Sequence, residues 1–155
     1  MSMMVLAFLI GGVAGLRAMA APAAVSWGAA LGWFSLQGTA LAFLGFKFTP
    51  YIFTVLALLE LVSDKLPRTP SRKVPPQFIA RILSGALCGA AIGASHGSLL
   101  GGLVAGALGA VVGTLAGAEF RSRLVAATGG SDRPIALLED AIAIAAGFLI
   151  AASVA

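Results

Sequence analysis

Five ionisable residues lie within or at the edges of strongly apolar stretches of this 155-residue chain. Arg17 lies deep in the first stretch, Glu60 and Asp64 lie four positions apart in a later one, and Glu139 and Asp140 are adjacent near the C-terminus. A charged side chain at the centre of a bilayer costs about 2.5–3.5 kcal/mol even on the most lenient insertion scale. We therefore expect each of these residues to have a buried partner or a ligand.

The spacing of the carboxylates suggests acid–base or ion-binding chemistry. Glu60 and Asp64 share one helix face, and two nearby like charges favour keeping a proton on one of them unless a cation such as Arg17 compensates. Glu139 and Asp140 follow the helix-starting residue Pro134 by more than one turn, so a helix dipole does not account for them. These five residues are the predicted site for an ion, a proton or an anionic ligand. A buried ion-pair network that only fixes helix packing is the alternative.

Other site chemistries find little support in the sequence. It has no Cys/His cluster for a metal, no phosphate-binding loop and no nucleophile elbow, so we expect no enzyme activity, no cofactor and no metal. A third possibility is an enzyme that acts on lipid head groups through the Glu, Asp and Arg residues. Cys88, in a Gly/Ala-rich window, is predicted to be a small packing residue, and His96 a solvated turn residue.

The elements that must position these residues are membrane helices. Hydrophobic residues make up 59% of the chain, charged residues only 10%, and the mean hydropathy is +1.01. Soluble domains carry roughly 25% charged residues. We predict an all-α, polytopic membrane helix bundle forming one domain over residues 1–155, with the lipid bilayer as its surroundings. The basic residues lack interleaved aromatics, which argues against a nucleic-acid partner despite the net charge of +4.

Six apolar segments are predicted, and they give five or six transmembrane helices. The segment at 31–46 is interrupted by Gly and polar residues, so it is a short helix, a re-entrant element or an interfacial helix. The basic loop 65–77 and the basic residues around 121–133 fall on one side, which the positive-inside rule makes cytoplasmic in an inner (plasma) membrane. Six crossings place both termini outside, whereas five place the N-terminus inside. The predicted spans are 3–25, 31–46, 50–66, 78–95, 99–118 and 134–154.

Glycine recurs every four residues along the two spans at 78–95 and 99–118. Such a stripe lets helix backbones approach closely in lipid, so we predict an antiparallel hairpin with its turn near His96. Abundant small-residue faces and the small size also predict a homo-oligomer. Residues 56–60 and 135–139 have weakly similar sequences, which would fit a three-plus-three inverted repeat. The stripe consists of Gly85, Gly89, Gly93, Gly97, Gly101, Gly109, Gly113 and Gly117, with Ala105 in its one gap.

Three motifs carry a resemblance to a known family. They are a Gly-x-Arg-Ala segment at Arg17, a Glu-x-x-x-Asp-Lys-x-Pro segment from Glu60 to Pro67, and the Glu139-Asp140 pair. Together they resemble a bacterial family of small membrane proteins known only as a domain of unknown function. The resemblance implies that these residues matter without implying a role. From the residues themselves we predict a small transporter or channel-like protein for a small ion or molecule, with a structural or assembly protein as the alternative.

Overall fold

A computed structural model describes residues 1–64, 74–130 and 132–155, and these residues form helices and turns without any strand. The all-α prediction is therefore confirmed for the described part of the chain. The predicted basic loop lies mostly outside it, including Lys65, Arg68, Arg72 and Lys73. The helices are α1 (Met3–Leu16), α2 (Ala20–Ala30), the short 3₁₀ helix η1 (Ala42–Gly45), α3 (Thr49–Ser63), α4 (Pro75–Ala94), α5 (Leu99–Ala127) and α6 (Arg133–Ala152).

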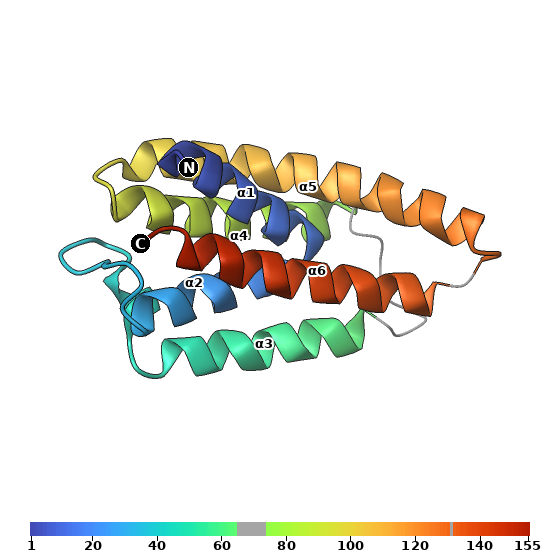
Figure 1. Ribbon diagram of the computed structural model, residues 1–155, viewed down its shortest axis with the longest axis horizontal. Coiled ribbons are helices and arrows are strands. Elements are labelled where there is room, and N and C mark those ends of the chain that lie inside the picture. The colour runs from blue at the N-terminus through green and yellow to red at the C-terminus, as the bar shows by residue number, and fades with distance from the viewer. Residues whose placement is uncertain (65–73, 131) are drawn as a thin grey trace.

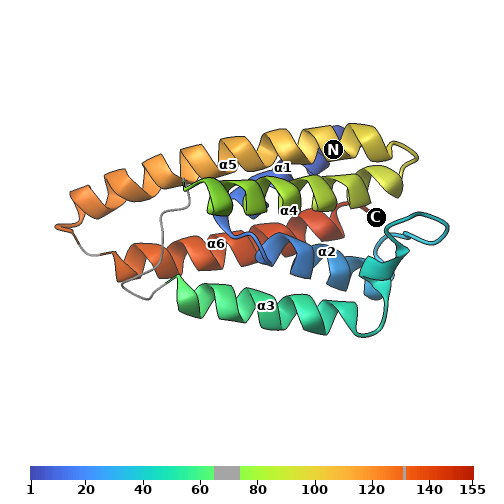
Figure 2. The ribbon, with the colours of Figure 1, turned by 180° about the vertical axis from the view of Figure 1, so that it is seen from behind.

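The predicted first span, 3–25, is divided into two helices. α1 ends at Leu16, Arg17 has an extended backbone, and α2 begins at Ala20. At 1.5 Å per residue α1 is about 21 Å long and α2 about 16 Å, each shorter than the ~30 Å hydrocarbon core of a bilayer. The two helices form a hairpin that returns to the end of the bundle where it began, as the front and back views show (Figure 1, Figure 2). The prediction of one crossing helix is wrong here.

Close contacts give the direction of each half of this hairpin. Along α1, Gly11 lies against Gly106 and Gly15 against Ala110, so α1 runs parallel to α5. Along α2, Ala24 lies against Gly147 and Gly28 against Ala151, so α2 runs parallel to α6. Because α5 and α6 are consecutive antiparallel helices (Figure 1), α2 runs opposite to α1.

Pro22 explains where the second half begins. It occupies the first turn of α2, where the amide hydrogen that proline lacks would have no intrahelical partner. The sequence predicts that Pro22 kinks or ends the first helix. In the structure the break precedes it, at residues 17–19, and Pro22 lies just inside the next helix.

The predicted second span, 31–46, is not a helix of spanning length. Gly32 and Gly38 adopt positive φ angles of 81° and 79°, a conformation that only glycine adopts readily, and the chain turns at each. The only helix in this segment is the 3₁₀ turn η1, which buries Leu44. The segment lies at the end of the bundle that also holds both termini (Figure 1).

Glycines pack α1, α4 and α5 together. The predicted α4–α5 hairpin is confirmed, with Gly85, Gly89 and Gly93 of α4 against the α5 backbone. The partner residues on α5 are Gly102 and Gly106, one position beyond the predicted Gly101 and Ala105. The α5 glycines at 109 and 113 instead lie against α1, at Phe8 and Gly12. α5 therefore has two glycine faces, one for each neighbour.

In the part of the chain that the structure describes, three helices, α4, α5 and α6, are long and apolar enough to cross a membrane, which is typical of a membrane protein. α3 is apolar but shorter, at 15 residues. Large apolar side chains point outward along the bundle, as they do where a protein contacts hydrocarbon; examples are Leu58, Leu59, Leu83, Leu100 and Leu149. The weakly similar segments 56–60 and 135–139 lie on antiparallel helices (Figure 1). The helices of the two halves of the chain differ in length, however, so the inverted repeat remains a prediction.

Candidate functional site

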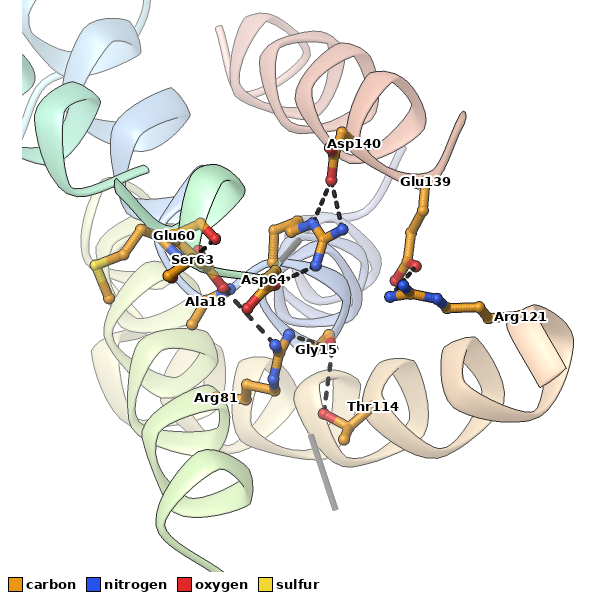
Figure 3. Close-up of polar contacts among 12 residues, drawn as sticks. Gly15, Ala18, Glu60, Ser63, Asp64, Arg81, Thr114, Arg121, Glu139 and Asp140 are labelled. Atoms are coloured by element: carbon orange, nitrogen blue, oxygen red, sulfur yellow. Dashed lines mark hydrogen bonds and ion pairs between the residues drawn. The ribbon is translucent and has the colours of Figure 1, made fainter. Parts of the chain in front are cut away.

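Arg17 lies at the helix break and reaches two other helices. Its backbone N–H still donates to the Val13 carbonyl of α1, but its side chain points across the bundle and is only 1% exposed. Nε and Nη2 each lie 2.5 Å from Oδ1 of Asp140 on α6. Nη1 donates to Oδ2 of Asp64, which immediately follows α3 (Figure 3). One guanidinium thus joins α1, α3 and α6.

Glu60 caps the second half of the broken helix. Its Oε1 accepts a hydrogen bond from the Ala18 N–H and its Oε2 accepts one from the Met19 N–H, both at 2.8 Å. These amides belong to the start of α2, where N–H groups have no intrahelical partner and the helix dipole is positive. The carboxylate therefore satisfies two backbone donors and complements the dipole at once.

The other side of the break is held by α4 and α5. Arg81 Nη1 donates to the Gly15 carbonyl of α1 at 2.9 Å, and Thr114 Oγ1 donates to the same oxygen at 3.4 Å. Ser84 Oγ donates to the Ala18 carbonyl. A cation at the carbonyl end of α1 and an anion at the amide end of α2 both match the helix dipoles. Arg81 Nη2 also lies 3.7 Å from Glu60 Oε1 and so links the two halves.

Glu139 belongs to a second cluster beside the first. Adjacent helical residues point about 100° apart, so Glu139 and Asp140 face different neighbours. Glu139 Oε2 lies 3.6 Å from Nη1 of Arg121 on α5 (Figure 3). Arg121 also donates to both carboxylate oxygens of Asp132, at 3.0 and 2.8 Å. The structure thus brings four of the five predicted residues, Arg17, Glu60, Asp64 and Asp140, into one network, and places Glu139 beside it.

Charge is layered within this network. The Arg17 and Arg81 side chains are 1% and 3% exposed, whereas those of Asp140, Glu60 and Asp64 are 9%, 13% and 14% exposed. The guanidinium groups lie innermost and the carboxylates lie nearer the outside. Among the described residues, no group of His, Cys, Asp and Glu has an arrangement that could hold a metal ion.

Four polar residues of the site were not singled out from the sequence. Arg81 and Ser84 lie near the start of the predicted span 78–95, and Thr114 lies inside the span 99–118. Arg121 was assigned only to a flanking loop, but it lies on α5, which extends well past the predicted end. Arg81 carried a usable signal, because it follows Phe78, Ile79 and Ala80 within the apolar run. Farther along α5, Glu119 forms an exposed ion pair with Arg123, whose Nε lies 2.8 Å from Glu119 Oε1.

Comparison with known proteins supports the resemblance drawn from the three motifs. A family model described as a domain of unknown function matches residues 4–154, nearly the whole chain. No curated protein and no solved structure matches the chain. Function must therefore be argued from the site itself.

Proposed function

We propose that this chain, which belongs to the DUF4126 family, is a small membrane transporter of protons or other small cations. The observation that carries the proposal is the arrangement at the helix break. The Arg17 guanidinium, at the break between two helices that are each too short to span a bilayer, is held by carboxylates at the end of α3 and on α6. Broken helices beside ionisable groups are the usual form of ion and substrate sites in secondary transporters.

Protonation supplies the switching step in this proposal. Asp64 and Asp140 hold Arg17 only while they are ionised, because a neutral carboxyl offers no ion pair. A proton that reaches either of them weakens one of the two attachments of Arg17. Since the attachments lead to α3 and α6, proton binding alters which helices are tied to the break. Arg17 stays charged throughout and acts as the fixed counter-ion.

The proposed orientation follows from the basic residues. α3 ends and α4 begins at the end of the bundle that carries Arg121, Arg123 and Arg133, opposite the two termini (Figure 1). Under the positive-inside rule that end faces the cytoplasm of a plasma membrane. The site lies in this half of the bundle, so it is proposed to exchange protons or cations with the cytoplasm in one step of the transport cycle.

Flux in proteoliposomes tests the proposal. Purified protein is reconstituted with a pH-sensitive dye inside, and an imposed pH gradient is followed with and without a counter-ion shunt. We expect Asp64→Asn and Asp140→Asn each to reduce proton-coupled flux by about tenfold or more, the range in which removing a proton-transfer group acts. Glu119→Gln, which removes an exposed pair, is the matched control and leaves flux unchanged. Wild-type flux equal to that of protein-free liposomes, or unaltered flux in both Asp variants, would refute it.

A structural role is the second candidate, and one observation favours it. Both Glu60 oxygens accept backbone hydrogen bonds, and Arg81 donates to a backbone carbonyl, so much of the network serves the fold. On this alternative, Arg17→Leu loses about 3–5 kcal/mol of stability because it leaves buried carboxylates without their cation. Replacing Arg17, Asp64 and Asp140 together by apolar residues restores stability. A refolded triple variant that still performs all cellular functions would favour this candidate over transport.

A further inference from the structure

A cleft between α5 and α6 lies outside the Arg17 network. Its volume is about 90 Å³, and Leu16 at the end of α1 contributes to its wall. α6 packs mainly on α2 and α1 and makes few contacts with α5, which leaves a space between α5 and α6. Apart from one ion pair, the lining residues that the structure describes are apolar: Leu16, Gly117, Phe120, Leu124, Ile135, Leu138 and Ile142.

The ion pair gives the cleft one polar edge. Among the described residues, Arg121 and Glu139 are the only charged ones that line the cleft, and Figure 3 shows them pointing toward each other from α5 and α6. Asp132, bound to Arg121 and with its side chain 56% exposed, extends this edge toward the start of α6. A cation and two carboxylates therefore lie together where the apolar lining ends.

The kind of molecule that can occupy the cleft depends on the environment of α5 and α6. Both helices that form it are long and apolar enough to cross a membrane, so in a bilayer its apolar lining would lie against hydrocarbon. Apolar cavities of this size exclude water and accept apolar guests, since an empty cavity forfeits dispersion contacts. The hydrocarbon available at this position is a lipid acyl chain.

We propose that this cleft is a binding site for one zwitterionic phospholipid with a primary ammonium head group, phosphatidylethanolamine. One acyl chain lies against Leu138 and Ile142. The head group lies at the polar edge, with its phosphate toward Arg121 and its ammonium donating hydrogen bonds to Asp132 and Glu139. A choline head group has no N–H to donate, and a glycerol head group has no positive charge, so both complement this edge less well. This site does not depend on transport activity.

Lipid retention by the full-length protein tests the site. Detergent-solubilised protein is titrated with palmitoyl-oleoyl phosphatidylethanolamine, phosphatidylcholine or phosphatidylglycerol, and bound lipids are counted by native mass spectrometry. Leu138→Trp and Ile142→Trp fill the cleft from two positions. Leu149→Trp, at a residue of the same helix that is 68% exposed and outside the cleft, is the matched control.

We expect wild type and Leu149→Trp to retain one phosphatidylethanolamine per chain in preference to the other two lipids. Both cleft variants should bind it about tenfold more weakly, the effect of losing contacts equal to roughly two methylene groups. Arg121→Gln should remove the preference among head groups. Equal retention of all three lipids by the wild type would overturn the head-group assignment. Undiminished binding in whichever cleft variant has the helical circular dichroism of the wild type would overturn the site itself.

Discussion

The carboxylates of the network differ in what they contact, although the sequence presents them as one group of acids. Asp64 and Asp140 bind the Arg17 guanidinium, whereas Glu60 binds backbone amides at the start of α2. The first two therefore bind a side-chain cation directly. Glu60 accepts hydrogen bonds from two backbone N–H groups, and its nearest cation, Arg81 Nη2, lies farther away at 3.7 Å. Substitutions at these acids should separate the two roles.

Glu60→Gln should destabilise the protein without removing a side-chain cation. A Gln side chain keeps one acceptor oxygen, but its NH₂ group would face the other backbone N–H of the pair at Ala18 and Met19. Leaving one buried donor unsatisfied costs about 1–3 kcal/mol. Thermal unfolding in detergent, followed by circular dichroism, measures this loss. Glu119→Gln, at an exposed surface pair, should change stability by no more than about 0.5 kcal/mol. Equal unfolding temperatures for the two variants would contradict the capping role.

At this scale the sequence predicts which residues are unusual but not how they pair. Arg17 is conspicuous because its depth in an apolar run makes its charge costly. Arg81 is less conspicuous because a cation near the start of a span usually reaches the interface. In the structure it turns inward to the Gly15 carbonyl, and only a broken helix supplies such an acceptor. The pairing of Arg81 therefore depends on a break that the apolar pattern does not reveal.

At the scale of the helices, composition predicts where the long apolar helices lie but not how the chain turns between them. Hydropathy predicts α4, α6 and the start of α5 well, because each is a long apolar run, but it ends α5 at residue 118 instead of Ala127. Hydropathy predicts α1 and α2 as one helix, because apolar residues continue through both. Composition does not reveal that the chain reverses direction between them. The glycine stripe predicts close packing, but α5 uses Gly102 and Gly106 toward α4. A helix with glycines on two faces does not reveal from spacing alone which face meets which neighbour.

Neighbouring glycines of α1 offer a paired test of this packing. A Cβ atom at Gly11 would overlap the backbone carbonyl of Gly106, whereas the nearest atom to a Cβ at Gly12 is 3.9 Å away. Gly11→Ala should therefore push α1 from α5 and cost about 1–3 kcal/mol or more. Gly12→Ala should leave stability unchanged or raise it by up to about 1 kcal/mol, because Ala favours helix. Thermal unfolding in detergent compares the two. Similar losses in both would mean that α1 does not pack on α5 through this face.

At the scale of the whole molecule, the helices fall into two groups that meet at the break. α1, α4 and α5 pack closely through glycine, and α2 packs mainly with α3 and α6. Arg17 directly follows α1 of the first group, and its guanidinium forms ion pairs with Asp64 and Asp140 of the second group. In the proposed transport cycle, its release from either carboxylate would loosen one group from the other.

The hairpin also fixes the relation between the two termini. Because α1 and α2 return to their starting end, both termini lie at one end of the bundle, and Thr128 lies at the other (Figure 1). In a Cys88→Ala background, cysteines placed at the exposed residues Ser2 and Ser153 should both react with an impermeant maleimide outside the cell. A cysteine at Thr128 should react only after permeabilisation. Labelling of the two termini from opposite sides would contradict the fold, and labelling of both only after permeabilisation would reverse the proposed orientation.

The broken first helix has a consequence for how the chain is made. A ribosome delivers α1 and α2 before the glycine surface of α4 and α5 exists, and long before Asp140 emerges in α6. Neither segment is long enough to settle alone across a bilayer, and Arg17 has its full complement of counter-charge only after the last helix arrives. The nascent hairpin must therefore wait at the membrane surface or beside the insertion machinery. Chains truncated before Asp140 should be substrates for membrane quality-control proteases.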